Sequence, residues 1–236
     1  MGLRLCLAQI RPLLVIATVA VPAAWISICL PKLRHRRAFA RRAARVVFTL
    51  AGMPLTVEHL DRLPPGPCVI VANHSSYLDG VVLMAALPPR FTFLIKEEIN
   101  AVPLVGLLLR RLGMAFVSRT DPKAAAGAAA RLIRAAKKGN AIGVFPEGTF
   151  RREPGLRSFR LGAFLAAART GLPVAPVTIR GTRYILPAGN RYLRQGPIRV
   201  TVLPAIVPAA PDREAAELLR KTARRAIVDH CGEPDI

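Results

Sequence analysis

Short apolar runs alternate with segments of helical periodicity along most of the chain. Runs rich in Val, Ile and Phe predict strands at 68–72, 91–95, 115–118, 141–145, 174–180 and 198–203. Helical patterns predict helices at 77–87, 103–112, 122–138, 159–170 and 212–230. Asp212 is the expected N-terminal cap of the last helix. Strands that alternate with helices are typical of an α/β fold, and we expect a mixed open sheet flanked by helices.

One predicted strand contains an exception to this pattern. Pro176 lies inside the apolar run 174–180. Because proline cannot donate a hydrogen bond to a neighbouring strand, it favours an edge position or a bulge. The sequence leaves both alternatives open.

The N-terminal segment follows a different pattern. Leu13 to Leu30 form an eighteen-residue stretch without a charge, interrupted only by Pro22. That length is enough to span a thinned bilayer, or to dip into one leaflet as an interfacial hairpin. A secretory signal peptide is the alternative, since Arg4 and Arg11 precede the stretch and small residues occur near its end. We predict a membrane-associated helical segment.

The residues that follow this stretch are rich in arginine. No acidic residue precedes Glu58, and apolar residues recur at helical spacing among the arginines of 32–50. We expect an amphipathic helix on the membrane, whose cations hold the rest of the chain on the cytoplasmic side. A solvated helix of the following domain is the alternative. The chain is thus expected to divide into a membrane-anchoring part, 1–57, and a second domain, 58–236, which begins near the proline-rich segment 63–67.

Composition narrows the partners and the compartment. The chain has 35 Lys and Arg against 14 Asp and Glu, a formal net charge of +21. Such a chain attracts polyanions, which include nucleic acid, anionic lipid headgroups and phosphorylated substrates. The four cysteines are scattered without a C-x-x-C pair, which indicates a reducing compartment, no disulfide framework and no metal site.

The strongest chemical signal follows the first predicted strand. His74 and Asp79 lie in the segment 73–79, directly after the run 68–72. A neutral imidazole, whose unperturbed pKa is about 6.5, can take a proton from an alcohol at working pH. A carboxylate on the other ring nitrogen fixes the tautomer and stabilises the imidazolium that forms. The other three histidines lack this arrangement, so His74 is the candidate general base, with Asp79 as its orienting group.

A second candidate site follows the predicted strand 141–145. Pro146 and Gly148 fix a tight turn that places Glu147 at the end of this strand. Arginines, whose planar groups suit bidentate phosphate binding, crowd the next stretch at Arg151, Arg152, Arg157 and Arg160. Taken alone, a solvated loop has the same pattern.

Two further segments complete a set of four ordered blocks. The blocks are His-x4-Asp at 74–79, Gly-x-x-Phe-x-x-Arg at 113–119, Phe-Pro-Glu-Gly-Thr at 145–149 and Val-x-Pro-Val at 174–177. Together they closely resemble the glycerophospholipid acyltransferase family, whose bacterial members include 1-acylglycerol-3-phosphate acyltransferases. Many members of that family place an arginine directly after Glu-Gly-Thr, where this chain has Phe150. Arg151 or Arg152 would then take that role.

The resemblance implies a reaction and its partners. An acyl group would move from acyl-CoA or acyl carrier protein to the sn-2 hydroxyl of 1-acyl-sn-glycerol-3-phosphate, forming phosphatidic acid without a further cofactor. His74 would take the hydroxyl proton, and Asp79 would orient its ring. The residues implied to hold the acceptor's phosphate and glycerol are Arg119, Glu147, Gly148, Thr149 and Arg151. The implied partners are the lysophospholipid acceptor, the thioester donor and membrane lipids, not nucleic acid, at the cytoplasmic face of the cell inner membrane.

Three alternatives stay open at this stage. Another lysolipid, such as a lyso-ornithine lipid, could be the acceptor. Ser75 or Ser76 could be a hydrolase nucleophile, but the chain has no Gly-x-Ser-x-Gly elbow, and we expect these hydroxyls to cap a helix that starts near Tyr77. A basic module that binds nucleic acid or membranes without catalysis fits the charge alone. The apolar N-terminal segment favours lipid over nucleic acid.

Overall fold

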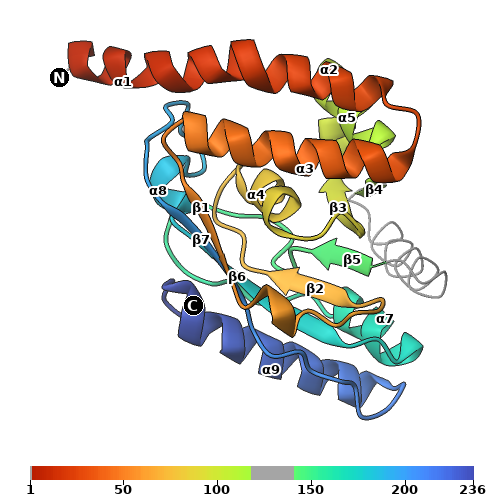
Figure 1. Cartoon of the computed structure of the whole chain (residues 1–236). Helices are drawn as coiled ribbons and strands as arrows, with labels where there is room; N and C mark the ends of the chain where they lie inside the picture. Colours follow the sequence, from red (N-terminus) through yellow and green to blue (C-terminus); the bar gives the residue numbers. More distant parts are fainter. Residues whose placement is uncertain (1, 118–140) are drawn as a thin grey trace.

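The computed structural model describes residues 2–117 and 141–236, which form a seven-stranded sheet between layers of helices (Figure 1). The strand order is β1-β7-β6-β2-β5-β3-β4, and neighbouring strands are parallel except for β6 and β7. The strands are β1 (Leu55–Glu58), β2 (Val69–Ala72), β3 (Phe91–Lys96), β4 (Ala115–Val117), β5 (Ala141–Val144), β6 (Val174–Arg180) and β7 (Ile198–Val202). A largely parallel sheet is stable only when both of its faces are covered.

Helices supply that cover. Helices α3 and α4 pack on one face of the sheet, and α7 and α9 pack on the other (Figure 1). The helices are α1 (Gly2–Val15), α2 (Val21–Cys29), α3 (Leu33–Leu50), α4 (Asp79–Ala86), α5 (Pro103–Arg111), α7 (Gly162–Thr170), α8 (Thr182–Ile185) and α9 (Arg213–Cys231). A π-helical segment, Ile16–Ala20, joins α1 to α2, and short 3-10 helices lie at Leu60–Arg62 and Glu97–Ala101.

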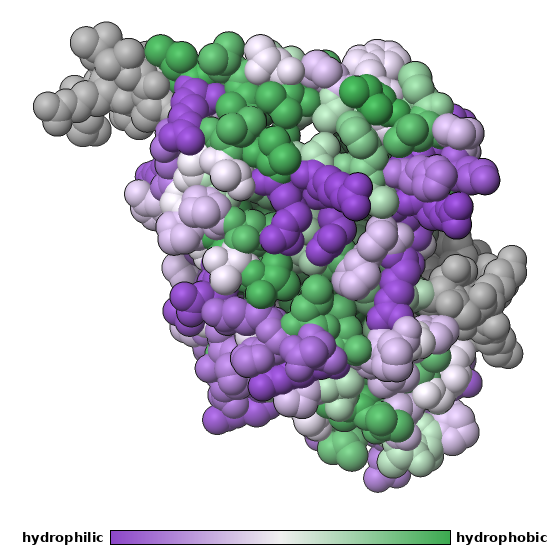
Figure 2. Space-filling model, viewed as in Figure 1, coloured by the Kyte–Doolittle hydropathy of each residue, from purple (hydrophilic) through white to green (hydrophobic). Residues whose placement is uncertain are grey.

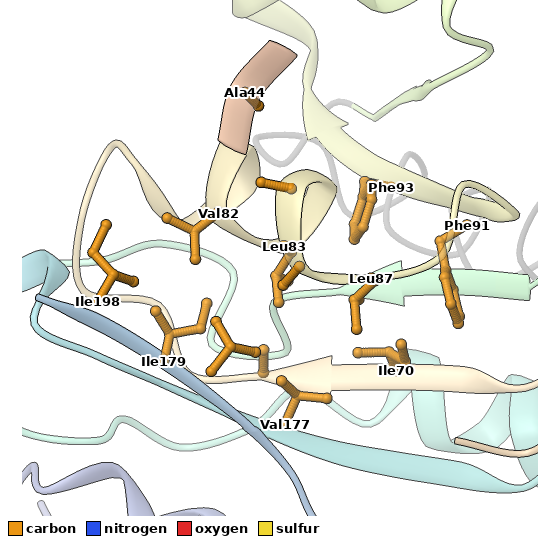
Figure 3. Packing of buried hydrophobic residues seen from close by; sticks show 14 of the residues in the cluster. Ala44, Ile70, Val82, Leu83, Leu87, Phe91, Phe93, Val177, Ile179 and Ile198 are labelled. Atoms are coloured by element: carbon orange, nitrogen blue, oxygen red, sulfur yellow. The ribbon is translucent and has the colours of Figure 1, made fainter. Parts of the chain in front are cut away.

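Strand β2 shows how the sequence produces two hydrophobic cores. Ile70 and Ala72 belong to the core beneath α3 and α4, whereas Val69 and Val71 belong to the core beneath α7 and α9. Side chains alternate between the faces of a strand, so a strand covered on both faces becomes a continuous apolar run. Figure 3 shows the first core, in which Leu83 of α4 points down toward the sheet and Leu87, just after that helix, lies above Ile70 of β2.

The apolar N-terminal segment forms a single long rod of α1, the π-helical segment and α2 (Figure 1). At the wider turn Ile16–Ala20 the following N–H bonds the carbonyl five residues back, and Pro22 comes directly afterwards. This spacing accommodates a residue that has no N–H and that would otherwise break the helix. The hydroxyl of Ser27 donates to the carbonyl oxygen of Ala23 at 2.8 Å, so its polarity is satisfied within the rod.

Polar contacts hold both ends of this rod against the rest of the molecule. The side-chain amide of Gln9 donates to the carbonyl of Leu193 at 2.6 Å and accepts the N–H of the same residue at 3.0 Å. At the other end, Arg111 donates from Nε and Nη2 to the carbonyl of Ile28 at 3.0 and 2.8 Å. The rod therefore lies along α3 and against α5 and does not project away from the sheet.

Arginines of α3 point into the sheet domain. Arg37 donates from Nε to the carbonyl of Leu112 at the end of α5 (2.8 Å), and Arg41 donates to the carbonyl of Ala86 at the end of α4 (3.2 Å). Cations at these positions satisfy carbonyls that lack an intrahelical partner and interact favourably with the negative end of each helix. Phe48 of α3 is only 3% exposed and joins the same core as β2.

The predicted α/β fold, a mixed open sheet flanked by helices, is confirmed. The pattern missed β1, because its four positions are exposed or only half-buried and lack an apolar run. This strand spans the boundary that was expected between 1–57 and 58–236. The expected cap of the last helix is confirmed, since Asp212 accepts the N–H of Ala215 at 2.8 Å. The predicted helix 122–138 lies outside the described residues.

Pro176 lies in an interior strand, so the edge alternative is wrong. Strand β6 has β2 on one side and β7 on the other. Val177 pairs with Val202, yet Val174 pairs with Ile206, so the segment after β7 has one extra residue between the two pairs. This is the two-against-one arrangement of a β-bulge, which was the second alternative. The bulge interrupts the hydrogen bonding between β6 and the segment after β7 at Pro176, which has no N–H to donate.

We predict that Leu83→Ala lowers the free energy of unfolding by about 2–5 kcal/mol, because it leaves a cavity in the core of Figure 3. Leu218→Ala is the matched control, since Leu218 is 60% exposed and its loss should cost within about 0.5 kcal/mol. Chemical denaturation in mild detergent measures both values. Equal losses for the two variants would contradict the proposed core.

Candidate active site

Two of the four sequence blocks meet at one edge of the sheet, whereas the fourth block, 174–177, lies buried in the first part of β6. Strands β2 and β5 are parallel neighbours, so the segments 73–79 and 145–150 that follow them lie side by side. Strand β6 flanks β2 on its other side and brings Thr182 to the same edge. Ligands of open α/β sheets bind beyond the carboxyl ends of the strands. The second block ends at Arg119, which lies outside the described residues.

A carboxylate orients His74 from the first residue of α4. Oδ2 of Asp79 lies 2.9 Å from His74 Nδ1 and also accepts the N–H groups of Ser75 and Ser76 at 2.7 and 2.8 Å. The Asp79 side chain is 0% exposed and that of His74 is 13% exposed. Because three donors converge on one oxygen, rotation of the carboxylate would break all three bonds. A carboxylate can only accept, so the ring hydrogen lies on Nδ1 and is donated to Asp79. Nε2 then has the free lone pair that can take a proton.

Glu147 ties the two blocks together. Its Oε1 accepts the backbone N–H of His74 at 2.7 Å, and its Oε2 accepts the N–H of Arg157 at 3.0 Å. The side chain is only 5% exposed. Burial raises the pKa of Glu147 from 4.5 to about 7, and the nearby carboxylates of Asp79 and Glu233 add to that rise, while the two N–H groups oppose it.

Aromatic rings enclose the imidazole. The ring of Phe145 stacks on His74 with centroids 4.2 Å apart and an interplanar angle of 16°. Phe150 approaches the same imidazole at 4.4 Å, and its ring meets that of Tyr77 edge-on at 4.9 Å. Phe150, the residue at which the sequence departs from the family pattern, therefore contacts the candidate base. Sequence patterns gave no sign of this contact.

The turn between Glu147 and the arginines requires glycine. Gly148 has φ +79°, and a Cβ there would lie 2.7 Å from Nε of Arg160. Thr149 is exposed beside this turn, and Arg151 is exposed two residues later. The structure thus brings Glu147, Gly148 and Thr149 to the sheet edge that carries His74.

Asn73 is a site residue that the sequence did not identify. Its side chain is buried, donates to the carbonyl of Ile179 at 2.9 Å and accepts the N–H of that residue at 2.8 Å. Through these two bonds the Asn73 side chain continues the pairing of β2 with β6 beyond the end of β2, directly before His74. The signal in the sequence that could have identified Asn73 is its position between a buried strand and the candidate base.

Neither serine is the N-cap residue of α4, although Ser76 bonds the turn that begins at Tyr77, as predicted. Helix α4 begins at Asp79, and its N-cap residue, Leu78, makes no side-chain cap. The hydroxyl of Ser76 accepts the N–H of Leu78 at 3.1 Å and donates to the carbonyl of Leu186 at 2.7 Å, while that of Ser75 lies 3.3 Å from the hydroxyl of Thr182. Neither hydroxyl bonds the imidazole, which argues against a serine nucleophile.

The described residues also contain no cluster of three or more His, Cys, Asp or Glu that could hold a metal.

Comparisons with known proteins identify sequences that are similar to this chain. The sequence profile of the family described as Acyltransferase matches residues 54–180. The chain is 33% identical over 196 residues to the chloroplastic 1-acyl-sn-glycerol-3-phosphate acyltransferase BAT2 of Brassica napus, covering 80% of this chain and 57% of that protein. It is 31% identical over 143 residues to the 1-acyl-sn-glycerol-3-phosphate acyltransferase of Borreliella burgdorferi, covering 60% of this chain and 57% of that protein. The chain thus spans little more than half the length of these relatives.

A solved structure has the same fold. The crystal structure of PlsC, the 1-acyl-sn-glycerophosphate (LPA) acyltransferase of Thermotoga maritima, superposes with a TM-score of 0.77. The match covers 96% of this chain and 95% of that one, at 24% sequence identity. The arrangement of sheet and helices is therefore shared over nearly the whole chain.

The raised pKa of Glu147 predicts a pH dependence of stability. The folded protein binds a proton here more tightly than the unfolded chain, so this stabilisation is complete below about pH 4.5 and is lost as the pH rises through about 7. Between these values the carboxyl should lower the free energy of unfolding by up to about 1.4 kcal/mol per pH unit. Glu147→Gln cannot ionise and should lack this slope. Unfolding curves from pH 4.5 to 8 would contradict the assignment if both proteins lost stability in parallel.

Proposed function

The chain belongs to the acyltransferase family, and we propose that it transfers a fatty acyl group from a thioester donor to the sn-2 hydroxyl of 1-acyl-sn-glycerol-3-phosphate. The observation that carries this proposal is the His74–Asp79 pair, 2.9 Å apart at the carboxyl end of β2. The product would be phosphatidic acid. The names of the relatives support this choice of acceptor.

The pair is suited to general-base catalysis. Nε2 of His74 takes the proton of the acceptor hydroxyl as the oxygen attacks the thioester carbonyl. Asp79 holds the Nδ1 hydrogen and stabilises the imidazolium that forms. Collapse of the tetrahedral intermediate breaks the carbon–sulfur bond, and the imidazolium returns its proton to the leaving thiolate. The ester and a free thiol are the products.

Glu147 contributes by position in this proposal. Both of its oxygens accept backbone N–H groups, of His74 and of Arg157, so it sets the distance between the base and the arginine-rich segment. Arg151, with Gly148 and Thr149 before it, would hold the acceptor's phosphate and glycerol beside that base. Arg119 stays a predicted phosphate ligand.

A purely binding role fits these contacts less well. A module that only binds polyanions has no need of a buried carboxylate on one nitrogen of a partly exposed imidazole. A different lysolipid acceptor, such as a lyso-ornithine lipid, would use the same base. The exposed arginine after Phe150 supports a phosphate-bearing acceptor.

We also propose that the protein lies on a membrane through the α1–α2 rod. Gln9–Cys29 spans 21 residues with a mean hydropathy of 2.1, and it is the one helix in the described ranges that is long and apolar enough to cross a bilayer. Its exposed hydrophobic residues, each 38–59% exposed, are Ile10, Leu13, Leu14, Ile16, Val21, Trp25 and Ile26. Figure 2 shows hydrophobic side chains along the top of the molecule, where the rod lies, with hydrophilic side chains below.

The contacts at both ends of the rod favour attachment within one leaflet. Gln9 and Ile28 each bond to the sheet domain, so a rod that stood upright in the bilayer would break both contacts. A rod that lies flat keeps them and buries its apolar face among the acyl chains. The rod would then attach the protein to the cytoplasmic side of the inner membrane.

The first prediction concerns the base. His74→Ala should lower kcat/KM for acyl transfer from a long-chain acyl-CoA to lysophosphatidic acid by about 10²–10⁴-fold, because general-base catalysis is lost. Asp79→Asn should fall in the same range with an unchanged fold. His35→Ala, at an exposed site, is the matched control. Full activity of His74→Ala would overturn the proposed function.

The second prediction concerns the membrane. Replacing Leu14 and Trp25 together by Gln should lower partition into anionic vesicles by at least about tenfold, because burial of each side chain contributes about 1.5–3 kcal/mol. Leu218→Gln removes an equally exposed leucine from α9 and should have no effect. Co-sedimentation with vesicles measures both. Unchanged binding of the double variant would place the attachment elsewhere.

A further inference from the structure

We infer that Glu233, near the C-terminus, is a positioning residue that acts through Arg183 to shape the acceptor loop, defined as residues 151–155. This inference rests on the proposed function, because that function assigns the phosphate of the acceptor to Arg151. None of the four sequence blocks contains Glu233 or Arg183.

Arg183 gathers the acceptor loop around its guanidinium group. Nη1 donates to three consecutive carbonyl oxygens, those of Arg151, Arg152 and Glu153, at 2.9, 3.1 and 3.1 Å. The loop has no helix or strand of its own, and the side chains of these three residues are exposed. Its curvature therefore depends on one cation supplied by α8.

Glu233 holds both that cation and the end of the loop. Its Oε1 lies 2.5 Å from Nε of Arg183, and its Oε2 accepts the N–H of Gly155 at 2.9 Å. Gly155 has φ +134°, and a Cβ there would lie 2.6 Å from the side chain of Ile236. A glycine is thus required where the C-terminal residues pack against the loop.

The C-terminal residues are fastened to the same segment by backbone and side-chain bonds. The N–H of Leu156 donates to the carbonyl of Pro234 at 2.8 Å, and Leu156 forms a parallel bridge with Asp235. Arg224 of α9 donates to the carbonyl of Leu156 at 2.7 Å and pairs with Asp235. These contacts give Glu233 a fixed place beneath the loop.

The loop is joined to the active site at both ends. On one side Phe150 contacts the imidazole of His74, and on the other the N–H of Arg157 bonds Glu147. Between these two points the Glu233–Arg183 pair holds residues 151–155 through the carbonyls of 151–153 and the N–H of Gly155. Since Phe150 stands where family members carry arginine, Arg151 of the loop would take that role, and the direction of its side chain follows from the loop's backbone.

The energetics of the Glu233–Arg183 ion pair indicate that it shapes the acceptor loop more than it stabilises the fold. The side chains are 19% and 12% exposed, so both charges lose much of their hydration. Desolvation offsets a large part of the attraction within a buried ion pair. The planar guanidinium, with donors directed at a carboxylate and at three carbonyls, instead fixes relative directions that a lysine could not fix.

A ratio of two substrates tests this role. Acyl transfer from one acyl-CoA is measured to lysophosphatidic acid and to the matching monoacylglycerol, which lacks the phosphate. For Glu233→Gln and Arg183→Lys, the ratio of the two kcat/KM values should fall about tenfold, with KM for the donor unchanged. Glu217→Gln, which removes an exposed ion pair of α9, should leave the ratio as in the native protein. A general loss of folded protein lowers both values equally and leaves the ratio unchanged.

Hydrogen exchange supplies a second measurement that is independent of activity. Amides of residues 151–157 should exchange faster in Glu233→Gln than in Glu217→Gln, because the bonds at Gly155 and around Arg183 are lost. The inference would be overturned if the substrate ratio stayed at the native value in Glu233→Gln and Arg183→Lys, or if the exchange rate of these amides were unchanged. A native protein that acylates neither acceptor would overturn the proposed function. Hydrogen exchange alone would then test whether Glu233 and Arg183 shape the acceptor loop.

Discussion

The hydrogen bond from the His74 N–H to Oε1 of Glu147, 2.7 Å long, joins two segments that are 73 residues apart in the chain. It forms because β2 and β5 are parallel neighbours whose carboxyl ends coincide. The His74–Asp79 pair is local and could form after many strands. Its direction relative to the loop after β5 is set by the bond to Glu147 together with the rings of Phe145 and Phe150, which contact the imidazole. The site keeps this carboxyl buried although burial raises its pKa to about 7.

Much of the positive charge of the chain binds the chain itself. Arg37 and Arg41 end two helices, and Arg90 donates to carbonyls in the turn that includes Gly66. Arg183 and Arg224 do the same for the segment after the site. These guanidinium groups keep their charge, but they lie between elements of the fold, so the formal charge of +21 includes cations that have a structural role. The charge alone permitted a basic module that binds nucleic acid or membranes without catalysis, which the contacts of the site do not favour.

The fold was predictable where the physics is local. Both faces of β2 are covered, so its sequence is a continuous apolar run and was recognised, whereas the half-buried β1 was not. The proximity of His74 and Asp79 followed from their spacing in the sequence. Asn73, which bonds across to β6, and Glu233, which bonds a loop about eighty residues earlier, depend on tertiary pairing that no spacing reveals. Phe150 was visible as a departure, but its contact with the imidazole was not.

The central claim is that Asp79 holds the hydrogen of His74 on Nδ1 and leaves Nε2 free to take a proton. Nitrogen-15 NMR of the protein labelled at histidine tests it directly, because protonated and unprotonated ring nitrogens resonate far apart. The resonances of His74 are those that vanish in His74→Gln. Above neutral pH the account predicts a protonated Nδ1 and an unprotonated Nε2. An Nε2-protonated ring, or a mixture of tautomers like that of a free imidazole, would contradict it.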